Sequence, residues 1–259
     1  MLLEKCFREY VSNFRLALLF GLLLVFVPFF AAFPNIQFSS GTLSIEYAGV
    51  PLQFLLAEFV LVALFLAFFS FFVSLVVLAV RKDLSKIRVE FYLSEMLKKF
   101  ALKIFAFFFL YSLALFFLGF GLVLAGANLF LANAVLFVVS LPFVFVPQAV
   151  VIDEVSLPQA VMESVSFTWR NFRSFLFVFF AGSVLIALVL LVSFGVDLVA
   201  TRLFAGEYLA MLVSMVFIVP FVEILKTYAY MLKFDLIKRS EMAGVPAKVQ
   251  EPKKSKGKK

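Results

Sequence analysis

The chain has 259 residues, of which 64% are hydrophobic and 15% are charged, and its formal net charge is +7. A soluble domain of this length is nearer half apolar, so the composition excludes an ordinary soluble protein. The chain has no histidine and one cysteine, which excludes Ser-His-Asp and Cys-His catalysis and most zinc sites. We therefore expect no enzymatic activity, no cofactor and no bound metal.

Six stretches are long and apolar enough to cross a bilayer, which takes roughly 20 apolar residues in a helix. They predict an all-α membrane bundle of three hairpins, each preceded by an amphipathic helix at the inner face. The membrane domain is expected over 1–237, and the basic, polar segment 238–259 is expected to be a disordered tail. The six stretches are about 14–33, 54–80, 101–125, 129–152, 174–196 and 208–230.

Positive charge predicts the orientation of the bundle. With the N-terminus inside, every one of the 23 Lys and Arg residues except Arg202 falls in a segment assigned to the inside. Loops on the cytoplasmic side of membrane proteins are enriched in Lys and Arg. The sequence therefore predicts a multi-pass protein of the plasma membrane with both termini in the cytoplasm.

The first hairpin begins with an amphipathic segment and carries a small outer domain. Residues 2–13 place apolar and polar side chains on opposite faces at helical spacing. After the first span, 36–38 and 43–47 alternate apolar and polar residues around Ser40-Gly41. This alternation predicts a β-hairpin at the outer face.

Prolines interrupt two of the later spans. Pro142, Pro147 and Pro220 lie within apolar runs, and proline in a helix frees a carbonyl and produces a kink. Ser156, followed by Gln159, predicts the start of another amphipathic helix. This interfacial helix is expected to end in Trp169, Arg170, Asn171 and Phe172.

The three amphipathic segments share a register, which suggests a threefold internal repeat. Phe14, Phe100 and Phe172 each stand just before an apolar run, and the positions three, seven and eleven residues earlier are apolar in every copy. The repeat units are expected at about 1–80, 85–152 and 156–232. The shared apolar positions are Val11, Leu97 and Trp169; Phe7, Leu93 and Val165; and Leu3, Val89 and Val161.

The stretches 147–154, 160–164 and 169–172 resemble the six-span membrane domain of glycerophosphodiester phosphodiesterase-type proteins and related uncharacterised bacterial and archaeal membrane proteins. Pro220 and the segments 227–230 and 235–239 are similar to the closing motif of that group. The resemblance implies a six-span fold. In fused members a separate soluble domain with catalytic histidines carries the phosphodiesterase activity. This chain has no histidine, so that activity is not carried over.

Ionisable residues inside the spans are the best candidates for function, because a charge within lipid costs a few kcal/mol. They are Glu58, near the outer end of the second span, and Glu223 and Lys226 in the sixth. Glu223 and Lys226 lie three residues apart and can form an internal ion pair. The other reading is that Glu223 is a buried carboxylate that takes up protons or a cationic ligand beside the Pro220 kink.

Two functions remain open. The first is a non-catalytic accessory or scaffold protein that binds lipids or other membrane proteins, including further copies of itself. The alternative is a small transporter or lipid-handling permease that uses an intramembrane carboxylate. The lysine-rich tail fits contact with anionic lipid, contact with RNA, or a role as a solvated determinant of topology.

Overall fold

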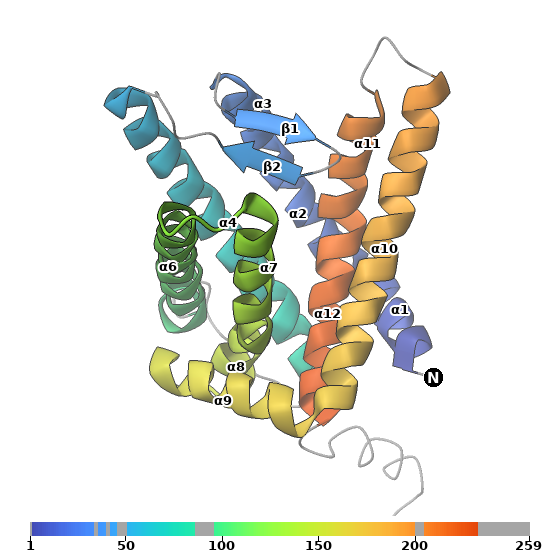
Figure 1. Cartoon of the computed structure of the whole chain (residues 1–259). Coiled ribbons are helices and arrows are strands. Elements are labelled where there is room, and N and C mark those ends of the chain that lie inside the picture. Colours follow the sequence, from blue (N-terminus) through green and yellow to red (C-terminus); the bar gives the residue numbers. More distant parts are fainter. Residues whose placement is uncertain are drawn as a thin grey trace, which may run out of the picture.

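The structure is a computed structural model that describes residues 2–33, 36–39, 42–45, 51–85, 96–199 and 205–232. Apart from one two-stranded sheet, the described elements are helices (Figure 1). Six of the described helices are long and apolar enough to cross a membrane, which confirms the predicted bundle. They span Phe14–Ala31, Gln53–Lys82, Leu97–Leu124, Phe130–Ile152, Phe172–Leu198 and Tyr208–Met231.

The first hairpin carries the sheet between its two spans. The strands pair antiparallel, with Ile36 opposite Ile45 and Ser39 opposite Thr42, so the predicted β-hairpin is confirmed. The elements are α1 (Leu2–Ser12), α2 (Phe14–Phe20), the 3₁₀ segment η1 (Gly21–Val25), α3 (Phe26–Ala31), β1 (Ile36–Ser39), β2 (Thr42–Ile45) and α4 (Leu52–Ser85).

The second hairpin turns tightly between its spans. Gly126 has a φ of +83°, which glycine adopts without strain, and the side chain of Asn128 accepts a hydrogen bond from the backbone N–H of Leu131. The elements are the π-helical η2 (Leu97–Ala101), α6 (Leu102–Leu124), α7 (Leu129–Ser140), the 3₁₀ segment η3 (Leu141–Phe143) and α8 (Val146–Ile152).

The third hairpin follows a helix that lies across the end of the bundle opposite the sheet (Figure 1). This helix, α9 (Leu157–Arg170), starts with the predicted capping box of Ser156 and Gln159. It is followed by α10 (Phe172–Val199), α11 (Ala205–Val213), the π-helical η4 (Ser214–Ile218) and α12 (Val219–Met231).

The second span of each hairpin lies toward the centre of the bundle. Within the most apolar 18-residue window of each span, the buried share rises from 22% to 33% in the first hairpin. It rises from 6% to 39% in the second and from 11% to 44% in the third. α4, α8 and α12 pack against one another. The first span of each hairpin therefore forms the outer layer, which a membrane would surround with lipid.

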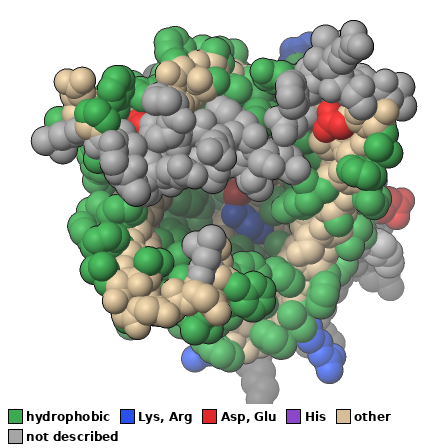
Figure 2. All heavy atoms as spheres, turned by 45° about the horizontal axis from the view of Figure 1, so that its top comes forward, with side chains coloured by type: hydrophobic (Ala, Val, Ile, Leu, Met, Phe, Trp, Pro, Cys, Tyr) green, Lys and Arg blue, Asp and Glu red, His purple; other side chains and the backbone are tan. Residues whose placement is uncertain are grey.

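The hydrophobic core occupies the half of the bundle near α9. Core residues include Phe20, Val77, Ile104, Val150 and Leu225. Large apolar side chains near the turn of the second hairpin are exposed; Phe130, for example, is 84% exposed. Figure 2 brings the sheet end forward and shows a hollow between the helices. Its walls are mainly hydrophobic, and basic and acidic side chains are visible at its floor.

Both described amphipathic helices present apolar side chains away from the bundle. In α1, Cys6 and Tyr10 are buried, whereas Phe7 is 60% exposed. In α9, Ser164 is buried, whereas Trp169 is 71% exposed. Each apolar face found in the sequence is therefore divided: Tyr10 and Val161 pack on the bundle core, whereas Phe7 and Trp169 face away from it and suit contact with the interfacial region of a membrane.

The predicted repeat units share a local irregularity at their anchors. A turn at Asn13 precedes Phe14, a turn at Asn171 precedes Phe172, and Phe100 lies in the π-helical η2. Among the shared apolar positions, Val89 and Leu93 lie outside the described residues, as do Arg202, the segment 235–239 and the predicted tail. The residues three before each anchor are all exposed, and those four before each anchor, Tyr10, Met96 and Thr168, are all buried.

Candidate functional site

Three charged side chains are buried within the described part of the chain, and they are the three predicted candidates, Glu58, Glu223 and Lys226. The structure brings Glu223 and Lys226 together on α12. Glu58 lies apart from them, on the first turns of α4 at the sheet end of the bundle. A third polar side chain, Gln148, joins the pair on α12.

Glu223 binds both of its polar neighbours through its carboxylate. The ammonium of Lys226 lies 2.6 Å from Oε1, and the amide nitrogen of Gln148, on α8, donates to Oε2 at 2.9 Å. The hydroxyl of Thr227 donates to the backbone carbonyl of Glu223 at 2.7 Å. The ion-pair reading of the sequence therefore describes the geometry of this site, which joins α8 to α12.

Gln148 contributes an unused acceptor to the site. Its side chain is fully buried, and within the described part of the chain Oε1 has no hydrogen-bond partner. A carboxylate only accepts, so the amide nitrogen must face Glu223, and the amide oxygen is left without a donor. A buried carbonyl without a partner costs about 1–3 kcal/mol. The site can therefore accept a hydrogen bond from a water molecule or from a bound polar group.

The proline in the last span shapes the α12 half of the site. Pro220 has no N–H, so the carbonyl of Val216, four residues earlier, loses its usual helical donor. The helix is π-helical over this stretch, and the hydroxyl of Tyr10 donates to the oxygen of Val216 at 3.1 Å. Tyr10 thus fixes α1 against the kink that lies one turn before Glu223.

The prolines of the fourth span shape the α8 half in the same way. Between Pro142 and Pro147 the helix is interrupted by η3 and a turn. The hydroxyl of Ser164, on α9, donates to the carbonyl of Pro142 at 2.7 Å and accepts from the N–H of Phe145 at 3.2 Å. An α9 side chain therefore closes the broken turn and places Gln148 at the start of α8.

A second polar cluster joins three elements at the α9 end of the bundle; we call Arg81, Lys99 and Glu154 the Glu154 cluster. Arg81 Nη1 donates to Glu154 Oε1 and to the carbonyl of Val151, each at 2.8 Å. The ammonium of Lys99 binds the other carboxylate oxygen. Glu154 has a φ of +56°, a conformation that is uncommon outside glycine and that these contacts hold in place.

The two cations of the Glu154 cluster lower the pKa of Glu154. Burial by itself raises the pKa of Glu154, but the hydrogen bonds and positive charges of Lys99 and Arg81 outweigh it and lower the pKa below its usual value. Sequence reasoning missed this cluster, because Arg81 and Lys99 lie 73 and 55 residues from Glu154. Beside the cluster, the hydroxyl of Tyr230 donates to Asp153. The grouping of Lys and Arg at the ends of the spans was the feature of the sequence that could have indicated this cluster.

The remaining predicted site residues lie at the end of α9. Trp169, Arg170 and Phe172 are exposed, and Asn171 forms the turn between α9 and α10. Within the described ranges, no group of three or more His, Cys, Asp or Glu side chains is arranged to hold a metal ion. The site of Glu223, Lys226 and Gln148 combines a carboxylate, an ammonium and an amide in buried surroundings. These groups suit the binding of a polar ligand and the exchange of a proton.

Comparison of the chain with protein-family models, with curated proteins and with solved structures finds no match. The resemblance to phosphodiesterase-type membrane domains therefore stays a prediction.

Proposed function

We propose that this chain is a non-catalytic multi-pass protein of the plasma membrane that binds a membrane lipid between its hairpins. The observation that carries the proposal is the hollow at the sheet end of the bundle, with mainly hydrophobic walls and charged side chains at its floor (Figure 2). A lipid combines an apolar body with a polar head and matches that lining. The accessory role with a protein partner belongs to the same proposal, since the exposed apolar faces of α1 and α9 are open to membrane neighbours.

Both termini are placed in the cytoplasm in this proposal. The Lys and Arg residues of the described part gather at the α9 end, where Arg81, Lys99 and Lys103 contact the segment after α8. Positively charged segments favour the cytoplasmic side. The sheet and the mouth of the hollow then face outward, and the basic tail lies next to the anionic inner leaflet.

The bundle is also proposed to be a threefold repeat of parallel units. The shared irregularities at Phe14, Phe100 and Phe172, and the central place of the second span in each hairpin, support this reading. Repeats of the same orientation are related by an axis along the membrane normal, as in several transporter folds. A hollow along such an axis is lined by all three units.

A transporter or permease is the second candidate function. The observation in its favour is the unused acceptor of Gln148 beside the Glu223–Lys226 pair, between two proline-interrupted helices. Interrupted helices with polar groups near the middle of a bundle are typical of transporter sites. In this reading Glu223 exchanges a proton or a cation when the pair opens.

Gentle purification of the full chain and of a chain ending at Arg239, followed by mass spectrometry of what stays bound, tests the proposal. A specific lipid retained by both forms is expected. A stoichiometric protein lost with the tail would identify the tail as the docking segment for an accessory role. Two forms that are both free of specific lipid and of protein would contradict the proposal. Glu223→Gln, measured on the protein that remains folded, separates the candidates: it abolishes transport by a permease and leaves the binding of an accessory partner intact.

A further inference from the structure

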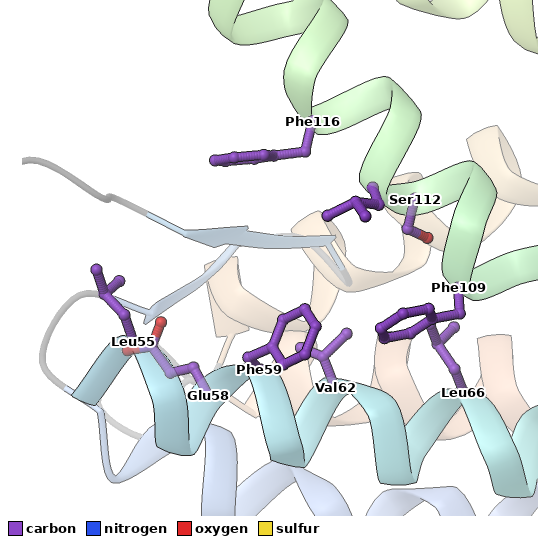
Figure 3. A pocket seen from close by; sticks show the side chains of 9 residues that line it. Leu55, Glu58, Phe59, Val62, Leu66, Phe109, Ser112 and Phe116 are labelled. Carbon is purple, nitrogen blue, oxygen red and sulfur yellow. The ribbon is translucent and has the colours of Figure 1, made fainter. Parts of the chain in front are cut away.

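A cavity of about 270 Å³ lies between α4 and α6 in the half of the bundle nearer the sheet. Figure 3 shows its side chains rising from the facing sides of the two helices. Two of them are polar, Glu58 on α4 and Ser112 on α6. The others are apolar: Leu55, Phe59, Val62, Leu66, Phe109, Leu113 and Phe116.

Glu58 is the unusual member of this lining. It is only 3% exposed, and neither of its carboxylate oxygens has a hydrogen-bond partner among the residues that the structure describes. The other two buried charges of the described chain, Glu223 and Lys226, neutralise each other. A buried charge without a partner is costly enough that proteins keep one mainly where it serves a function. The described part of the chain therefore supplies an acceptor at this cavity, the carboxylate of Glu58, and a bound ligand can supply the matching donor.

The chemistry of the lining defines that donor. A carboxylate repels anions and attracts ammonium groups, and aromatic rings add to the attraction when a cation lies over their faces. The rings of Phe59 and Phe109 meet edge to face with centroids 5.3 Å apart, and together they form an apolar wall close to Glu58. The volume lies just under the range of about 300–1,000 Å³ for small-molecule sites, so the occupant is compact.

We propose that the cavity between α4 and α6 binds an amine-bearing amphiphile, with its ammonium on Glu58 and its apolar part against the phenylalanines. Two sources share this chemistry: the headgroup of an amino lipid and a free alkylamine. The inference goes beyond the proposed function, because it assigns a site with its own residues and a ligand of defined charge. It stands or falls separately from lipid binding in the hollow.

The test uses the full chain purified in dodecylmaltoside, a detergent without charge, and titration calorimetry with octylamine. Saturable binding is expected for the native chain. Octanol, which has the same tail and no charge, is expected to bind at least about tenfold more weakly. Glu58→Gln keeps the shape of the side chain and removes its charge, and it is expected to weaken octylamine binding by a similar factor. Glu4→Gln, which neutralises an exposed carboxylate on α1, is the matched control and is expected to bind as the native chain does.

Phosphatidylethanolamine added to the micelles distinguishes the two sources. Competition with octylamine identifies a lipid headgroup as the occupant, and undisturbed octylamine binding identifies a free amine. Ser112→Phe fills the cavity, leaves Glu58 in place and is expected to abolish binding, so it serves as a second variant if Glu58→Gln does not fold. The proposal is overturned if the native chain does not bind octylamine. It is equally overturned if octanol binds as tightly, or if Ser112→Phe binds as the native chain does.

Discussion

The hydroxyl of Tyr10 donates a hydrogen bond to the carbonyl oxygen of Val216, across 3.1 Å and 206 residues of sequence. The carbonyl lacks its helical donor because Pro220 follows four residues later. A residue of the N-terminal helix thus satisfies a defect in the last span. The hydroxyl of Ser164 donates to the carbonyl of Pro142, so hydroxyls from α1 and α9 bind backbone carbonyls in η4 and η3, the irregular segments of the last and fourth spans.

Tyr10→Phe is expected to lower the free energy of unfolding by about 1–3 kcal/mol, because it leaves a buried carbonyl without a donor. Burial raises the pKa of Tyr10 to about 12, so its hydroxyl keeps the proton it donates at any pH used for folding. Unfolding by SDS titration measures the change. Tyr208→Phe, which removes the hydroxyl of a tyrosine that is 66% exposed, is the control, and an equal effect of the two variants would contradict the assignment.

The Glu223–Lys226 pair is expected to behave as one unit. Glu223→Gln leaves a buried ammonium without its carboxylate, and Lys226→Met leaves a buried carboxylate without its ammonium; each is expected to cost about 3–5 kcal/mol. The double variant restores neutrality and should cost clearly less than the sum of the two. A double-mutant cycle of unfolding free energies measures the coupling. Strictly additive losses would show that the two charges are not paired.

Glu154 gives the stability of the protein a pH dependence of known sign. Its pKa is lower in the folded state than the ordinary value of about 4.3. Its ionised form therefore stabilises the fold above that ordinary value, and the contribution is lost as the pH falls through the lowered folded-state pKa. Glu154→Gln is expected to cost about 1 kcal/mol at neutral pH and to make unfolding less dependent on pH in the acid range.

Unfolding in detergent between pH 7 and pH 3 tests this dependence on the native chain and the variant. Glu4→Gln, an exposed carboxylate on α1, is the control and should follow the native profile. Parallel profiles for the native chain and Glu154→Gln would show that the contacts of Glu154 with Arg81 and Lys99 do not stabilise the fold.

Trp169 is expected to lie at the membrane interface. It is the only tryptophan in the sequence and is 71% exposed on α9, so its fluorescence reports on that helix alone. Reconstitution with lipids brominated at different depths should give the strongest quenching with bromine near the headgroups, where tryptophan is enriched. Strong quenching by aqueous iodide with none by brominated lipid would place α9 away from the bilayer.

The sequence was sufficient for the spans and the outer hairpin, because both depend on local patterns. Apolar runs of the required length predicted the six helices, and alternation around Ser40-Gly41 predicted the strands on either side. The distances of Glu154 from its partners explain why the Glu154 cluster was missed. Arg81 is 73 residues away and Lys99 is 55 residues away, and no local pattern joins them.

The orientation of the amphipathic helices was hidden for a different reason. Each amphipathic helix lies between the membrane and the protein bundle, and both of these neighbours are apolar. Hydrophobic periodicity therefore does not show which apolar side chains face the bundle and which face the membrane. In α9, for example, Ser164 and Phe167 pack inward, and Trp169 faces outward. The candidate residues Glu58 and Glu223 were found because charge inside an apolar run is conspicuous, but the pairing of Gln148 with Glu223 and the cavity beside Glu58 depend on packing between helices.

The Glu154 cluster also makes the contact between the first two hairpins depend on a residue outside both spans that it joins. Arg81 ends the first hairpin and Lys99 begins the second, and without an acid between them the two cations would repel each other. Glu154, 55 residues after Lys99, binds both cations and turns that repulsion into attraction. The segment that follows the second hairpin therefore holds the beginning of that hairpin against the end of the first.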